Sequence, residues 1–176
     1  GGALYILGHD GDLMIQRSDD DGLTWSAAVA LTRGQSWHGT AGNVLEQGGH
    51  VYLVMERRVS NHIRVWPVGE LAPVLLRGRS NSDLTRRTNW TFASELSFAN
   101  TILNVQSDPA IDFFGVPFFA APYPAGTMPA AGRACAPIGW LEGNVVRFDD
   151  PDHLLHDPSG RTFYIWLRAH TGGAGY

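Results

Sequence analysis

The chain has 176 residues, of which 44% are hydrophobic and 17% charged, and this composition is typical of a soluble globular protein with one core. A net charge of -4 argues against binding to nucleic acid, no apolar run is long enough to cross a membrane, and one cysteine excludes an internal disulfide. All 13 basic residues are arginine, the side chain that binds a carboxylate through two parallel hydrogen bonds.

The N-terminal part of the chain predicts three short strands separated by tight turns. Short apolar runs rich in aromatic and β-branched residues predict strands over residues 3–7, 13–18 and 27–32. Residues 8–12, with two glycines and two aspartates, predict the first turn. No segment of the chain shows a helical period, so the expected fold class is all-β.

The second turn, residues 18–25, follows the pattern Ser-x-Asp-x-Gly-x-Thr-Trp, with the fixed places held by Ser18, Asp20, Gly22, Thr24 and Trp25. Ser and Asp side chains bind the free N–H groups of a tight loop, and glycine accepts a backbone conformation that other residues resist. The tryptophan is expected to fold back as an apolar plug. The pattern predicts a β-hairpin turn.

This turn resembles the Asp-box of sialidases and related β-propeller proteins. The resemblance implies blades of four-stranded antiparallel sheets. An Asp-box lies away from the substrate in those proteins, so it indicates architecture rather than chemistry. The chain lacks the Phe-Arg-Ile-Pro motif of sialidases. The resemblance also implies a secreted or periplasmic protein.

The same pattern then repeats along the chain. Strands are predicted over residues 43–46, 50–57, 73–80 and 91–96, with a degraded Asp-box at 83–90. An irregular, proline-rich insertion over about residues 98–139 is expected to carry function. Two further strands are predicted over residues 143–148 and 161–168.

These repeats predict one domain, residues 1–176, that forms about two to three blades of a propeller. Two to three blades cannot close a propeller ring. We therefore expect that the chain is either part of a longer protein or one copy in a homo-oligomer. The structural alternative is a small open β-sandwich built from the same hairpins.

If the blades form, the loops sort onto two faces, and the candidate site residues fall mostly on one of them. The proposed substrate-binding residues are Trp37, Arg57, Arg168 and His170, and the proposed catalytic residues are His38, Glu142 and Asp112. Trp37 would stack on a sugar, Arg57 and Arg168 would bind its carboxylate, and His38 with Glu142 would move protons. The alternatives are a loop histidine that binds carbonyls and arginines paired with neighbouring acidic residues.

The expected function is that of a sialidase-like glycoside hydrolase whose partner is an acidic glycan. The alternatives are a polysaccharide lyase of propeller fold and a non-catalytic glycan-binding propeller. Residues 149–157 hold several aspartates and histidines, but Asp-Pro pairs form turns and no zinc-binding spacing is present. No metal and no cofactor is therefore predicted.

Overall fold

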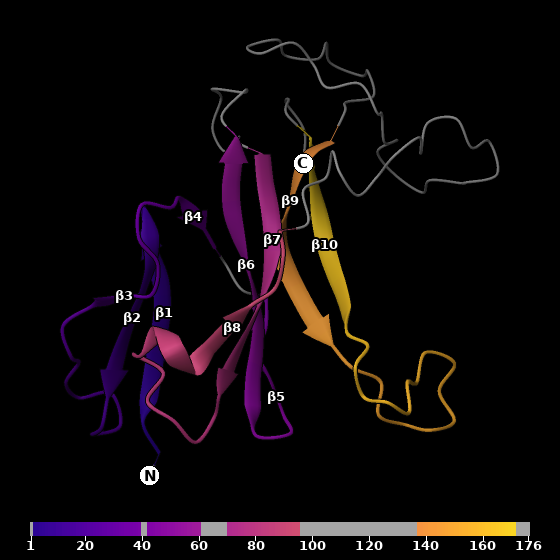
Figure 1. Ribbon diagram of the computed structural model, residues 1–176, viewed down its shortest axis with the longest axis horizontal. Coiled ribbons are helices and arrows are strands. Elements are labelled where there is room, and N and C mark those ends of the chain that lie inside the picture. The colour runs from indigo at the N-terminus through magenta and orange to yellow at the C-terminus, as the bar shows by residue number, and fades with distance from the viewer. Residues whose placement is uncertain (1, 40–41, 61–69, 96–136, 172–176) are drawn as a thin grey trace.

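The computed structural model describes residues 2–39, 42–60, 70–95 and 137–171, and this part of the chain forms three antiparallel sheets (Figure 1). Its one helical element is a 3-10 turn, η1 (Arg87–Asn89). The all-β fold class is therefore confirmed. In the described ranges, no helix has the length and apolar character that crossing a bilayer would need.

Sheet 1 contains β1 (Leu4–Asp10), β2 (Asp12–Ser18) and β3 (Val29–Ala30) in that order. Strand β1 runs on to Asp10, so the predicted turn over residues 8–12 shrinks to a tight reversal at Gly11, whose φ is 69°. Of the predicted strand over residues 27–32, Val29 and Ala30 form β3. The Leu31 N–H still donates to the Leu13 carbonyl of β2 at 2.8 Å.

The turn that follows β2 has the hydrogen bonds that its sequence predicts. The Ser18 hydroxyl accepts a bond from the Gly22 N–H at 2.9 Å, and the Asp20 carboxylate accepts bonds from the Thr24 N–H at 2.8 Å and hydroxyl at 2.5 Å. Gly22 has a φ of 89°, in the left-handed region that favours glycine. The Ser, Asp, Gly and Thr of the pattern therefore build one turn.

Trp25 corrects one detail of the predicted turn. A Cβ added to Gly22 would lie 3.7 Å from its indole, so the ring does fold back over the turn. It nevertheless stays 37% exposed, and it is therefore not the buried plug that the pattern suggested.

The Asp20 carboxylate gives a pH-dependent contribution to stability. Hydrogen bonds from the Thr24 hydroxyl and N–H lower the pKa of Asp20 from 3.8 to about 2. A depressed folded-state pKa means that this stabilisation is complete above about pH 4 and is lost as the pH falls toward 2. The urea midpoint of unfolding should therefore rise between about pH 2 and pH 4, and we expect Asp20→Asn to remove part of this rise. Asp21→Asn, at the exposed neighbouring position, is the control and should show the same rise as the unmodified chain.

Sheet 2 contains β4 (Trp37–His38), β5 (Leu45–Gln47), β6 (His50–Ser60), β7 (Glu70–Arg79) and β8 (Trp90–Phe92). Strands β4 and β5 both pair with β6, β4 near its C-terminal end and β5 at its start. They therefore form one interrupted edge strand. Residues 37–38, where a loop was expected, belong to this strand.

The degraded Asp-box between β7 and β8 also forms a hydrogen-bonded turn. The Asp83 carboxylate accepts bonds from the Thr85 N–H and hydroxyl at 3.1 and 2.7 Å, and the Asn89 amide donates to the Asp83 carbonyl at 2.8 Å. Trp90 is 6% exposed and donates its indole N–H to the Leu84 carbonyl at 2.7 Å. In this turn, unlike the first one, the tryptophan ring is buried against the core, as the pattern predicts.

Sheet 3 pairs β9 (Pro137–Val146) with β10 (Tyr164–Thr171). Strand β9 begins before the predicted residue 143, so the segment taken as an insertion already ends in a strand. The rest of that segment, through residue 136, lies outside the described residues.

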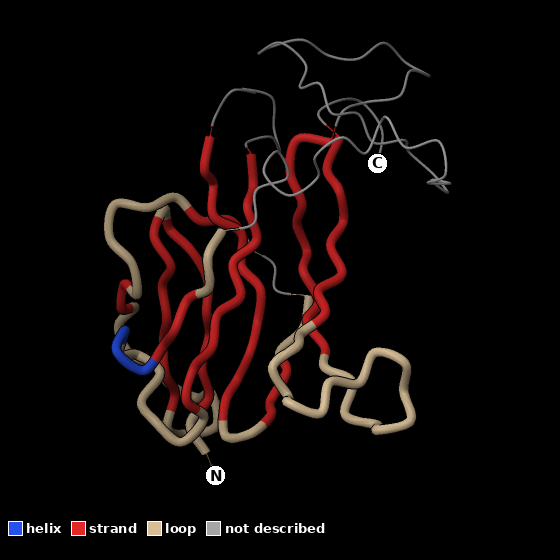
Figure 2. Tube along the Cα trace, turned by 45° about the vertical axis from the view of Figure 1, so that its right-hand side comes forward, coloured by secondary structure: helices blue, strands red, loops and turns tan. Residues whose placement is uncertain are grey.

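The three sheets stand side by side along the molecule, with sheet 2 in the middle (Figures 1 and 2). Strand β6 therefore buries both faces. Leu53 and Met55 pack with Leu13 and Ile15 of sheet 1, whereas the alternate residues Tyr52 and Val54 pack with Val145 of sheet 3. Sheet 2 is therefore packed between sheets 1 and 3.

Turns also separate onto two ends of the sheets. The β1–β2 turn and the β6–β7 end of sheet 2 lie at the top of Figure 1, whereas the β5–β6 turn and the β9–β10 connection lie at the bottom. Successive turns of the described antiparallel strands therefore lie at opposite ends of the sheets.

Candidate functional site

A buried carboxylate, Glu56, connects the residues predicted to do chemistry. Its side chain is 0% exposed, one oxygen accepts a 2.8 Å bond from the Glu142 N–H, and the other lies 3.8 Å from Nδ1 of His38. His38 is also the cross-strand partner of Glu56 between β4 and β6. Because an unpaired buried charge is costly, a carboxylate with these neighbours is a candidate for a functional role.

The position of Glu56 follows from strand periodicity. It lies on the face of β6 that also holds Tyr52 and Val54, toward sheet 3. Strand β9 can approach this face because it has a glycine there: a Cβ on Gly143 would lie 2.6 Å from Cγ1 of Val54. The close approach brings the backbone N–H of Glu142 to the Glu56 carboxylate.

Glu142 sits in an unusual backbone conformation at a β-bulge. Its φ is 58°, a value that few residues other than glycine adopt, and the β9–β10 register shifts at this point. Bulges redirect side chains, and this one leaves the Glu142 side chain 41% exposed while its N–H points at Glu56.

Glu142 and Arg168 form an ion pair, with 3.0 Å between Oε1 and Nη2, across β9 and β10. Arg168 is 44% exposed, so both charged ends reach the surface. The structure therefore presents a carboxylate and a guanidinium side by side, and the N–H of the same Glu142 also binds the buried Glu56.

His38, the other neighbour of Glu56, also contacts sheet 1. Its side chain is 19% exposed, and its ring centroid lies 5.7 Å from that of His9 on β1. We define the site cluster as His38, Glu56, Glu142 and Arg168. Three of its members were predicted from the sequence, and they come from β4, β9 and β10.

Trp37 requires a correction. The ring is 4% exposed, packs edge-on against Phe92 and donates its indole N–H to the Gln35 side chain at 2.9 Å. It belongs to the core between sheets 1 and 2. A ring with both faces covered offers no surface to a sugar, so the proposed stacking role does not fit this structure.

The remaining predicted residues within the described part of the chain pair with residues outside the site cluster. Arg57 forms an ion pair with Glu95, which matches the alternative interpretation of an arginine held by a neighbouring acidic residue. His170 pairs with Gly139 across sheet 3. Asp112 lies outside the described residues.

Glu56 itself was not predicted as a site residue. It follows the apolar run of residues 51–55, and in a strand buried on both faces such a run predicts core positions. The available signal was the charge itself, because a carboxylate that continues a fully buried strand needs a partner.

The acidic connection between β9 and β10 behaves as a turn. The Asp157 carboxylate accepts bonds from the hydroxyls of Ser159 and Thr162, both at 2.8 Å, and these bonds lower its pKa well below the usual range. Across the described ranges, no group of three His, Cys, Asp or Glu side chains is placed to hold a metal ion.

Comparisons with protein-family models, with curated proteins and with solved structures all gave no match for this chain.

Proposed function

We propose that this chain is part of a carbohydrate-active β-propeller that acts as a sialidase-like glycoside hydrolase on an acidic glycan. Three features support the architecture: successive antiparallel sheets, their face-to-face packing, and hydrogen-bonded turns at the Asp-box and at its degraded copy.

The proposed chemistry rests on one observation: the Glu56 carboxylate contacts both the His38 ring and the Glu142 N–H. Glycoside hydrolysis needs groups that give and take protons at the glycosidic oxygen and at water. Glu142 supplies a partly exposed carboxylate and His38 a partly exposed imidazole, so these two groups would exchange those protons. Glu56 is fully buried and would position both rather than contact the sugar.

Arg168 would provide recognition of an acidic sugar. Its guanidinium reaches the surface beside Glu142, and a guanidinium binds carboxylates through charge-assisted hydrogen bonds. A substrate carboxylate bound there would lie next to the Glu142 side chain.

A polysaccharide lyase is the second candidate, and the His38–Glu56 contact favours it. A histidine beside a buried carboxylate is a suitable base for removing a proton next to a uronate, whose negative charge Arg168 would offset. A non-catalytic glycan-binding propeller would use the same arginine without turnover.

A panel of acidic oligosaccharides separates these functions. The chain is incubated with sialylated and uronate-containing glycans, while reducing ends and ultraviolet absorbance are both followed. We expect new reducing ends without added absorbance, as hydrolysis requires. Added absorbance would instead identify an unsaturated lyase product, and binding without either signal would leave only the glycan-binding function.

A further inference from the structure

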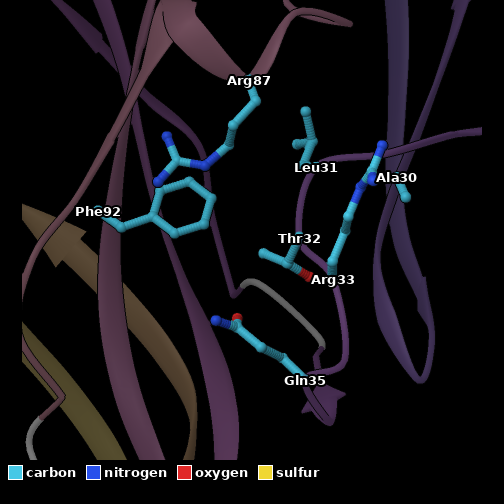
Figure 3. A pocket seen from close by; sticks show the side chains of 7 residues that line it. All are labelled: Ala30, Leu31, Thr32, Arg33, Gln35, Arg87 and Phe92. Carbon is cyan, nitrogen blue, oxygen red and sulfur yellow. The ribbon is translucent and has the colours of Figure 1, made fainter.

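A pocket of about 420 Å³ lies between sheets 1 and 2, and none of its lining residues belongs to the site cluster (Figure 3). Its main lining residues come from the segment after β3 and from η1 and β8: Leu31, Thr32, Arg33, Gln35, Arg87 and Phe92. This volume falls in the range of small-molecule sites. The lining includes two arginines and no acidic residue.

Arg87 is held in a fixed orientation. Its guanidinium stacks on the Phe92 ring, 4.0 Å from the centroid, and its Nη1 donates to the Trp90 carbonyl at 2.9 Å. Within the described ranges, Nε and Nη2 have no hydrogen-bond partner. These two nitrogens form one edge of the guanidinium, and such an edge binds an oxyanion through two parallel bonds.

Gln35 has a defined amide orientation, and its amide nitrogen has no hydrogen-bond partner among the residues that the structure describes. The indole N–H of Trp37 can only donate, so the Gln35 atom that it meets at 2.9 Å must be the oxygen. The amide nitrogen of Gln35 therefore points away from Trp37, and Figure 3 shows this side chain beside the space that Arg33 and Arg87 also line.

Arg33 adds a second positive charge. In the part of the chain that the structure describes, no hydrogen bond or ion pair engages its side chain. The carboxylate bonded to the loop that carries Arg33 is Asp12, which accepts bonds from the Thr32 hydroxyl and the Gly34 and Gln35 N–H groups, at 2.7, 2.9 and 3.0 Å. Asp12 is thus occupied in shaping the loop.

The geometry points to a binding site for a small oxyanion, the carboxylate or phosphate of a sugar-sized ligand. Arg87 binds two of its oxygens, Arg33 supplies a second charge, and the Gln35 amide donates one more hydrogen bond. This site is separate from the site cluster, and it does not depend on the proposed glycan chemistry.

Calorimetric titration of the full chain tests the site with three probes: glucuronate, glucose 6-phosphate and glucose. We expect both anionic sugars to bind and glucose not to bind, and raising the salt from about 0.05 to about 0.5 M to weaken the anionic sugars. Binding of one anionic sugar alone would support the site and identify its anion as a carboxylate or a phosphate. Equal binding of glucose, or no binding of either anion, would overturn the proposal.

Three charge-neutralising variants complete the test. Arg87→Gln and Arg33→Gln should each weaken the anionic sugars about tenfold or more, because each removes a charge-assisted contact. Arg33 is exposed, and within the described residues its side chain makes no hydrogen bond or ion pair, so the effect of Arg33→Gln reports binding and not folding. Arg86→Gln, an exposed neighbour outside the pocket lining, is the matched control and should change affinity less than about twofold. An equal loss in Arg86→Gln would contradict the site.

Discussion

Replacing Glu142 with glutamine is expected to slow turnover of an acidic glycan by about 10²- to 10⁴-fold, the usual contribution of a positioned proton-transfer group. Glutamine has nearly the same shape and keeps the backbone N–H that donates to Glu56. Its side-chain oxygen can still accept a bond from Arg168. The change therefore removes the titrating group and its charge while it preserves the fold of the bulge.

The pH dependence distinguishes a chemical role of Glu142 from a structural one. If Glu142 exchanges a proton with the substrate, Glu142→Gln should also remove one limb of the pH profile of kcat/KM. Glu46→Gln, at an exposed position on β5, changes the net charge equally and should leave rate and profile unaltered. Unchanged turnover in Glu142→Gln would exclude the proposed proton transfer.

Replacing Trp90 with alanine is expected to lower the free energy of unfolding by about 3–5 kcal/mol, as for other buried aromatic residues. Trp90 is 6% exposed and packs in the core that joins sheets 1 and 2. Its removal opens a cavity there, and it also leaves the Leu84 carbonyl without the indole N–H that it accepts. Urea unfolding followed by circular dichroism measures the loss.

Trp25→Ala is the matched control, because Trp25 holds the same place in the first Asp-box. Its indole is 37% exposed, so we expect a loss of about 1 kcal/mol or less. Equal losses of unfolding free energy in Trp90→Ala and Trp25→Ala would contradict the view that burial of the ring decides its contribution.

Local patterns predicted the sheets well because turn chemistry acts over a few residues. Gly11 and Gly22 occupy left-handed conformations, and Ser18 with Asp20 supplies the side-chain bonds of the first Asp-box. The strand limits were less accurate where pairing decides them. Residues 37–38 read as a loop, yet β4 forms because Trp37 and His38 lie opposite Arg57 and Glu56.

The candidate site was only partly predictable, because its geometry depends on contacts between sheets. Arg168 and Glu142 were proposed from their places in the repeat, and their ion pair required the β9–β10 register. Trp37 was misread because a tryptophan next to glycine and histidine suits a surface loop as well as a core. The role of Glu56 required knowing that β9 packs on β6, which no local pattern contains.

The Asn43 side chain binds the backbone of sheet 3 through a donor and an acceptor bond, the pair of bonds that a residue of a neighbouring strand would make. Its amide donates to the Val145 carbonyl and accepts from the Val145 N–H, both at 2.8 Å, and the Gly42 N–H donates to the Gly143 carbonyl at 3.0 Å. Apolar packing alone lets two sheets slide past each other, whereas directional bonds do not. These bonds fix the position of sheet 3 relative to sheet 2 along the strand direction. They thereby place the Glu142 N–H opposite the Glu56 carboxylate.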